Sequence, residues 1–198
     1  QMGWTQEQKT AVWTEIVLEK ICNQAKTLVE NGHESEAAML TGYMRELVPG
    51  DGTNREGHAA KVYFNALFGK NFSRGQENPI NAALNYGYGL ILSAFNREVT
   101  LCGYLTHIGL CHDNMFNPYN LSCDMMEPFR AIVDRKVIDI APVEFGKKEK
   151  QELLGILHSP VRIAGTEQTV MNAVKIYSRS VFEAIELADA DRLNFIEL

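Results

Sequence analysis

The chain has no long hydrophobic run. Its longest nearly apolar stretch covers residues 86–95, whereas a helix needs about 20 apolar residues to cross a bilayer. We therefore expect no membrane partner. Glycine and proline are not enriched, with 15 and 6 among 198 residues, which excludes a collagen-like or linker-like chain. With 45% hydrophobic and 22% charged residues, the composition indicates one folded globular domain.

An excess of positive charge is missing too. The chain holds 19 Lys and Arg against 25 Asp and Glu, a formal net charge of −6. This balance argues against a basic protein that coats DNA non-specifically. It leaves room for a DNA enzyme with a local basic face and bound metal ions.

Cysteines are few, and none forms a Cys-x-x-Cys pair. The four are Cys22, Cys102, Cys111 and Cys123. In a chain of this size they indicate reduced, mostly buried thiols. His107 and His112 lie among the last three, but the spacing fits no common zinc pattern. We therefore expect no zinc site.

What the sequence does contain is helical periodicity. Apolar residues recur at helical spacing between capping and breaking signals, and no long alternating run predicts a sheet. Only Val161 to Ile163 suggests a short strand or an extended loop. The expected helices cover residues 5–30, 36–48, 55–68, 80–100, 120–137, 147–157 and 170–188. The sequence therefore predicts an all-α fold, a single helical domain of about six to seven or more helices.

Several residues indicate how these helices begin and bend. Thr5 and Gln8 form a capping box, and Asn54 is placed to cap the third helix. Pro128 falls inside the fifth helix, where we expect it to bend the chain. Gly87 and Gly89 in the fourth helix favour close helix packing. They do not form a dinucleotide-binding fingerprint, because no strand precedes them.

Acids and one imidazole stand at three special places. Glu56 lies in the first turn of a helix, where the helix dipole favours a carboxylate, although an ordinary capping acid would lie there too. His112 lies in a loop of small and polar residues, where it could equally hydrogen-bond locally. Asp124 and Glu127 share one face of a helix. Their mutual repulsion must be offset by solvent, by a cation, or by a basic neighbour such as Arg130.

Carboxylates together with one imidazole suit Mg²⁺ or Mn²⁺. These metals are used in the cleavage and transfer of phosphodiesters. Because the three segments are far apart in the sequence, only folding can bring them together.

At these residues the sequence resembles the family of CRISPR-associated integrases that acquire spacers, the first ("Cas-one") protein of those systems. The motif Asp124-x-x-Glu127-Pro128-Phe129-Arg130 is similar to that of type II systems. The matching segments are residues 56–64, 78–88, 109–112 and 121–130.

The resemblance implies a domain organisation and a site. The family has an N-terminal β-rich domain and a C-terminal helical catalytic domain, and this chain matches only the helical one. We therefore expect residues 1–198 to be the C-terminal α-helical catalytic domain, a fragment of a longer protein whose β domain is absent from this chain. The family's catalytic metal ligands map onto Glu56, His112 and Glu127. Asp124 corresponds to a further acid near the metal, which would be Mg²⁺ or Mn²⁺.

The implied activity is that of a metal-dependent DNA endonuclease and integrase in antiviral defence. A DNA 3′-hydroxyl would attack a phosphodiester at the edge of a repeat and insert a protospacer into the CRISPR array. Among the residues that could contact DNA, Tyr86 could equally be a core-packing residue, and Arg130 could orient the acids rather than bind a phosphate. The candidate DNA-binding residues are Tyr86, Asn81, Asn85, Arg74, Arg130 and Arg162.

The resemblance also implies partners. These are protospacer and repeat DNA, a second copy in a homodimer of the full-length protein, and the small second ("Cas-two") adaptation protein. It implies a location in the cytoplasm of a prokaryote.

Two alternatives stay open. The dipeptide His112-Asp113 is typical of HD-type metal-dependent phosphohydrolases, with His58 and Asp124 or Asp134 as further ligands, but this leaves Glu56 and Glu127 unexplained. The chain could also be a non-catalytic helical module for DNA binding or assembly.

Overall fold

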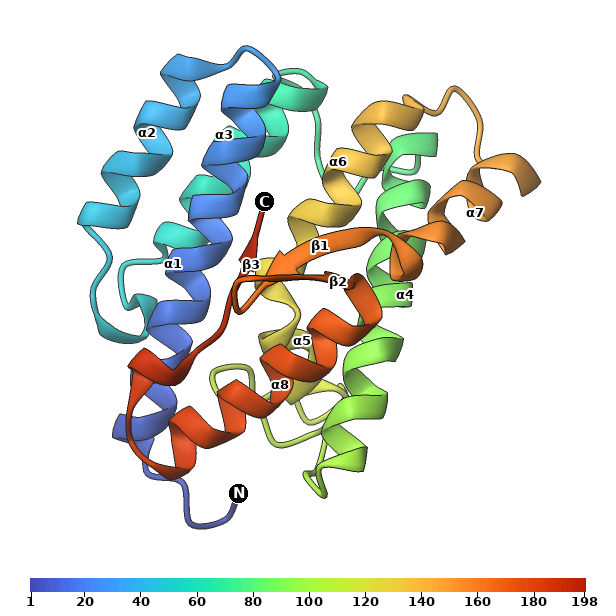
Figure 1. The fold of residues 1–198 in the computed structure, drawn as a ribbon. Coiled ribbons are helices and arrows are strands. Elements are labelled where there is room, and N and C mark those ends of the chain that lie inside the picture. Colours follow the sequence, from blue (N-terminus) through green and yellow to red (C-terminus); the bar gives the residue numbers. More distant parts are fainter.

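The computed structural model describes residues 1–198 and is mainly helical, which confirms the all-α prediction (Figure 1). No helix combines the length and apolarity needed to cross a membrane. The eight α-helices are α1 (Gln6–Glu30), α2 (Glu34–Arg45), α3 (Arg55–Phe68), α4 (Pro79–Leu101), α5 (Asn120–Met125), α6 (Arg130–Ile140), α7 (Lys147–Leu154) and α8 (Val170–Glu186). Short 3₁₀ turns occupy Pro49–Asp51, Glu127–Phe129, Gly155–His158 and Ala190–Arg192.

The long helix α1 packs against α2 and α3 on one side of the molecule (Figure 1). Its start confirms the predicted capping box, because the Thr5 side chain accepts from the Gln8 backbone while the Gln8 side chain accepts from the Thr5 backbone. Gly69 follows α3 at a φ of 100°, a conformation that glycine adopts without steric cost. The predicted bounds of these helices therefore hold to within a few residues.

Helix α4 contacts α6, α7 and α8, and so occupies the middle of the other half. At Gly87 an added Cβ would overlap Cγ1 of Val133 on α6. The prediction of close packing is confirmed there, since only a residue without a side chain lets the two helices approach this closely. At Gly89 it is wrong, because a Cβ would meet nothing within 4 Å.

The helix expected over residues 120–137 is divided at Pro128. The structure has α5, then a 3₁₀ turn that contains the proline, then α6. Proline has no N–H to donate and its ring clashes with the preceding turn of a helix. The division matters for function because Glu127 opens the 3₁₀ turn.

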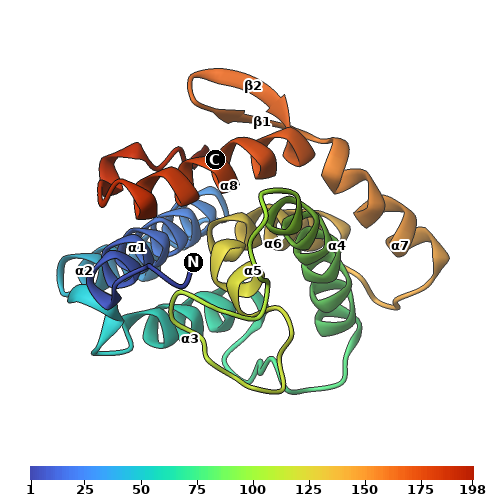
Figure 2. The same ribbon diagram turned by 90° about the horizontal axis from the view of Figure 1, so that it is seen from below.

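A small antiparallel sheet lies against α8, in the order β2-β1-β3. Its strands are β1 (Pro160–Ile163), β2 (Thr166–Thr169) and β3 (Ile196–Glu197). Only β1 was expected as an option, and the polar sequence of β2 gave no strand signal. The hairpin formed by β1 and β2 lies on the opposite side of the molecule from the loop of residues 103–119 (Figure 2).

Candidate active site

The first acid, Glu56, is fixed by the turn that precedes α3. The two carboxylate oxygens of Asp51 accept hydrogen bonds from the backbone N–H groups of Arg55 and Glu56, at 2.6 and 3.0 Å. Asn54 takes up a left-handed conformation with φ of 54° and accepts from the backbone of Gly57. Two side chains therefore satisfy the free N–H groups at this helix start, and they hold Glu56 in place.

The second acid, Glu127, is buried, with 4% of its surface exposed. Arg130 Nε donates to its Oε1 atom at 2.8 Å. Burial alone would raise the pKa of Glu127, but the charges of Lys20 and Arg130 outweigh burial and lower it. Glu127 is therefore a charged carboxylate at neutral pH.

A lysine joins the two acids. Lys20 on α1 is only 8% exposed, and its Nζ contacts both Oε1 of Glu56 and Oε2 of Glu127. Burial acts to lower the pKa of Lys20, yet the charges of Glu127 and Glu56 raise it overall. The two carboxylates thus hold one positive charge between them.

His112 is held by Asp124, which is completely buried. The Asp124 Oδ2 atom accepts from the backbone N–H groups of Leu110, Cys111 and His112 at 2.7, 2.9 and 3.3 Å. Its Oδ1 atom contacts Nδ1 of the His112 ring. This hydrogen bond to Asp124 is the largest cause of a raised pKa of His112, with burial opposing it.

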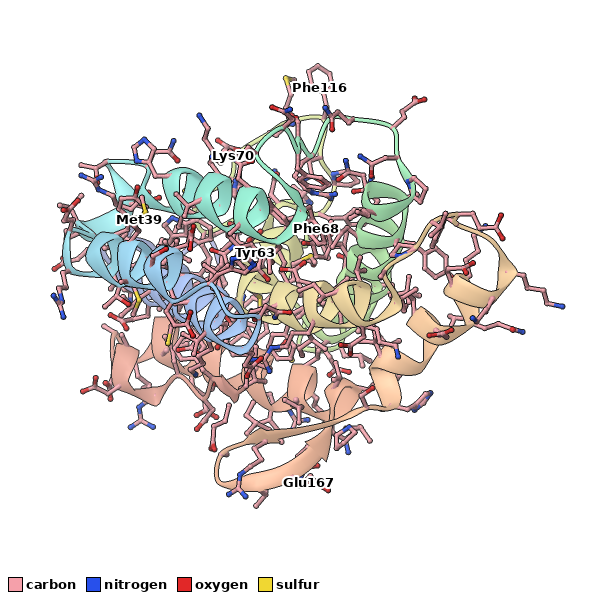
Figure 3. The ribbon with its side chains drawn as sticks, turned by 90° about the horizontal axis from the view of Figure 1, so that it is seen from above. Met39, Tyr63, Phe68, Lys70, Phe116 and Glu167 are labelled. Atoms are coloured by element: carbon pink, nitrogen blue, oxygen red, sulfur yellow. The ribbon has the colours of Figure 1, made fainter.

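The loop that carries His112 is fixed from several sides. A Cβ at Gly109 would overlap the carbonyl oxygen of His112 and lie 2.8 Å from Asp124 Oδ2. The Trp13 ring packs edge-on against His112, with centroids 5.6 Å apart. Phe116, at the outer end of the loop, points away from the protein and is 87% exposed (Figure 3).

The chemistry of these donors fits a hard divalent cation. Carboxylate oxygens and one imidazole nitrogen suit Mg²⁺ or Mn²⁺, and Glu56 and Glu127 already share a cation, the Lys20 ammonium. The Nε2 atom of His112 makes no hydrogen bond. No three His, Cys, Asp or Glu side chains converge closely enough to form a ready-made metal centre. Both oxygens of Asp124 are engaged within the protein.

The family model described as CRISPR associated protein Cas1 matches residues 1–150. The chain belongs to the Cas1 family. It is 35% identical over 203 residues to the "CRISPR-associated endonuclease Cas1" of Neisseria meningitidis, covering 100% of this chain and 67% of that protein. The chain therefore spans about two thirds of the length of this Cas1 relative.

Two solved structures share the fold. A chain of a partial Cas6-RT-Cas1–Cas2 complex superposes with a TM-score of 0.77 and 17% identity, over 96% of this chain and 71% of that one. A casposase bound to integration product superposes with a TM-score of 0.67 and 19% identity, over 92% of this chain and 64% of that one.

Four of the six expected DNA-binding residues of this Cas1 chain, Arg74, Asn81, Asn85 and Arg130, lie together. The Arg74 guanidinium donates to the side-chain oxygens of Asn81 and Asn85. Arg74 and Arg130 both lie over the Tyr88 ring, at 5.3 and 4.6 Å from its centroid. Arg74 also lines a cavity of about 400 Å³ together with Lys61 and Lys70.

The other two candidates do not join this group. Tyr86 packs edge-on against Phe145, with centroids 5.7 Å apart. Arg162 lies on β1 and pairs with Glu197 at 3.4 Å, on the side of the hairpin.

Sequence reasoning missed Lys20, Asp51 and Tyr88. Lys20 falls on the apolar face of α1, where the apolar stem of a lysine side chain can pack without any special role. A lysine at a core position is a signal in itself, since a fully buried lysine needs a charged partner.

Proposed function

We propose that this chain is the C-terminal helical catalytic domain of a divalent-metal-dependent DNA endonuclease and integrase that inserts protospacer DNA into a CRISPR array. The observation that carries the proposal is the pairing of Glu56 and Glu127 around one cation. The names of the relative and of the casposase support nuclease and integration chemistry. The β domain would belong to the part of the full-length protein outside this chain.

Glu56, Glu127 and His112 Nε2 would hold the metal. A bound Mg²⁺ or Mn²⁺ would supply Lewis-acid chemistry for the attacking 3′-hydroxyl and for the charge that develops on the phosphate. Asp124 orients the imidazole through Nδ1, so that Nε2 is presented as the ligand, as carboxylates commonly do for metal-bound histidines. Because a metal-bound nitrogen must be unprotonated, activity should fall at acidic pH. Arg130 fixes the orientation of the Glu127 carboxylate.

We assign the DNA path to the groove beside Arg74. Its guanidinium is held by two amides and lies over an aromatic ring, and it pairs with no carboxylate, so its charge is available to a phosphate. Lys61 and Lys70 extend the positive charge along the cavity. Tyr88, whose ring contacts both guanidinium groups, links this groove to Arg130 and hence to Glu127.

The partners follow from the same proposal. One similar structure is a complex with Cas2, and we propose that the full-length protein forms a homodimer that binds such a second protein, along with protospacer and repeat DNA. It would act in the cytoplasm of a prokaryote, where a CRISPR array is located.

The test is strand transfer on branched DNA with Mn²⁺, using the full-length protein. Glu56→Ala, His112→Ala and Glu127→Ala should each abolish transfer. Asp113→Ala should keep it, because Asp113 is exposed and makes no side-chain contact with the site. Loss of activity in Asp113→Ala would instead favour HD-type chemistry. Retained activity in the first three variants would leave only a non-catalytic role for this domain.

A further inference from the structure

Lys20 takes up the position between the two acids that the proposed function gives to a metal. Its side chain enters from α1 and is 9% exposed, between Glu56 at 22% and Glu127 at 5%. The Oε2 atom of Glu127 accepts no hydrogen bond besides this ion pair. The ammonium group therefore contacts both carboxylates directly, and water has little access to the contact with Glu127.

An ammonium group and a divalent ion would compete for these same oxygens. A cation that bridges Glu56 and Glu127 must displace Nζ from at least one of them, and the displaced ammonium loses partners in a poorly solvated place. Breaking a buried ion pair is strongly unfavourable because it leaves an uncompensated charge. The cost of moving Lys20 is thus subtracted from the free energy of metal binding.

Without Lys20 the two carboxylates would favour metal binding instead of opposing it. The two carboxylates would then face each other with Arg130 as the remaining basic contact, on Glu127 alone. Like charges at close range destabilise the folded chain unless a cation neutralises them. A metal that binds to such a site relieves repulsion and displaces no side chain.

We propose that Lys20 is a built-in competitor for the metal: it stabilises the metal-free site and thereby lowers the metal affinity of Glu56 and Glu127. This inference rests on the proposed function in one respect, namely that these acids bind a divalent ion. It gives Lys20 on α1 a role that the resemblance does not imply.

The test is Mn²⁺ binding by titration calorimetry on the full-length protein. Lys20→Met, which keeps the length of the side chain without its charge, should bind Mn²⁺ at least tenfold more tightly than the parent, about 1.4 kcal/mol. In chelator, Lys20→Met should unfold at a lower temperature than the parent, and added Mn²⁺ should raise its unfolding temperature by more.

Two further variants make the result specific. Lys26→Met lies on the same helix outside the acid pair and should match the parent in Mn²⁺ affinity. Lys20→Gln covers the case in which Lys20→Met fails to fold, because its amide can still donate to one carboxylate, and it too should bind Mn²⁺ more tightly.

The outcomes separate this inference from the proposed function. Equal or weaker Mn²⁺ binding in both Lys20 variants, with parent binding that is lost in Glu56→Gln, would overturn the competitor role and leave the metal site standing. A parent, a Lys20→Met variant and a Glu56→Gln variant that all fail to bind Mn²⁺ would overturn both.

Discussion

Asp124 is expected to act on the metal site through His112 and its loop, and Asp124→Asn separates this role from direct metal binding. The substitution keeps the size of the side chain and replaces one carboxylate oxygen with an NH₂ group. In the parent, one oxygen accepts three backbone N–H groups of the loop and the other contacts the His112 ring. An asparagine can satisfy only one of these two sets of partners without change.

The expected loss of stability follows from the hydrogen bonds that the substitution weakens. Bonds to a charged acceptor contribute about 1.5–3 kcal/mol each, and those from Leu110 and Cys111, at 2.7 and 2.9 Å, have good length. If the asparagine oxygen keeps these two bonds without its charge, we expect a loss of about 2–4 kcal/mol, a large part of the roughly 5–15 kcal/mol of a typical domain.

The same orientation of the asparagine also changes which ring nitrogen of His112 carries the proton. With the asparagine oxygen on the loop, its NH₂ group faces His112 Nδ1, which must then act as the acceptor. The ring proton moves to Nε2, so that this nitrogen no longer offers a lone pair to a metal. Asp124→Asn should therefore weaken both the loop and Mn²⁺ binding.

Three measurements test this account on the full-length protein: urea unfolding, hydrogen exchange at the amides of residues 110–112, and Mn²⁺ titration. Asp124→Asn should lose stability, amide protection and Mn²⁺ binding together. Glu56→Gln serves as the control, since it should lose Mn²⁺ binding and keep the protection of these amides. If Asp124→Asn lost Mn²⁺ binding with unchanged stability and amide protection, Asp124 would be a direct ligand and the positioning role would be wrong.

Three further predictions concern residues that the fold constrains. Gly109→Ala should displace the loop of His112 and abolish Mn²⁺ binding by calorimetry, because its Cβ would overlap the His112 carbonyl; unchanged binding would show that the loop can move aside. Gly87→Ala should destabilise the protein by about 1–3 kcal/mol in urea unfolding, whereas Gly89→Ala on the same helix, which meets nothing within 4 Å, should be neutral or stabilising; equal effects would contradict the close packing of α4 on α6. Burial raises the pKa of Asp134 to about 6 despite hydrogen bonds from Tyr88 and Tyr63. The folded state therefore holds the proton of the Asp134 carboxyl group more tightly than the unfolded chain does, and the free energy of unfolding falls as pH rises through the folded pKa. In Asp134→Asn the free energy of unfolding should fall by about 2 kcal/mol less than in the parent between about pH 4 and about pH 7. A difference in unfolding free energy between variant and parent that does not change with pH would refute this prediction.

The helices could be predicted because their signals are local. Thr5, Asn54 and Thr169 each accept a backbone hydrogen bond at the start of a helix, and a cap of this kind involves residues only a few positions apart. The β1–β2 hairpin could not be predicted in the same way. Strand β2 is polar, with two exposed and two half-buried residues, and no alternating pattern in its sequence signals that it pairs with β1.

The candidate site shows the same difference between residues that the sequence signals and partners that only folding brings to them. The acids and His112 were named because they carry the resemblance, whereas their partners were not. Lys20 lies 36 residues before Glu56, and nothing local indicates that the two meet. Tyr88 lies in the segment 78–88 that carries the resemblance but was assigned no role, yet its hydroxyl donates to Asp134 and its ring contacts Arg74 and Arg130.

One face of α1 explains why the break at Pro128 lies where the chemistry is proposed. Lys20, Asn23 and Thr27 are spaced by three and four residues and therefore share a face of this helix. Lys20 contacts Glu127, Asn23 Nδ2 donates to the Pro128 carbonyl at 3.2 Å, and Thr27 Oγ1 accepts from Arg135 Nε at 3.1 Å.

These three contacts follow the chain from the 3₁₀ turn into α6. A proline there leaves backbone groups without their helical partners, and Asn23 satisfies one of them from outside. Asn23 thus replaces a hydrogen bond that a continuous helix would have made, and the buried polar face of α1 fixes the turn from which Glu127 points toward Glu56. A polar stripe on a helix that is otherwise part of the core is therefore best explained as the support of a site on its neighbour, and Lys20 is the residue of that stripe that reaches the site itself.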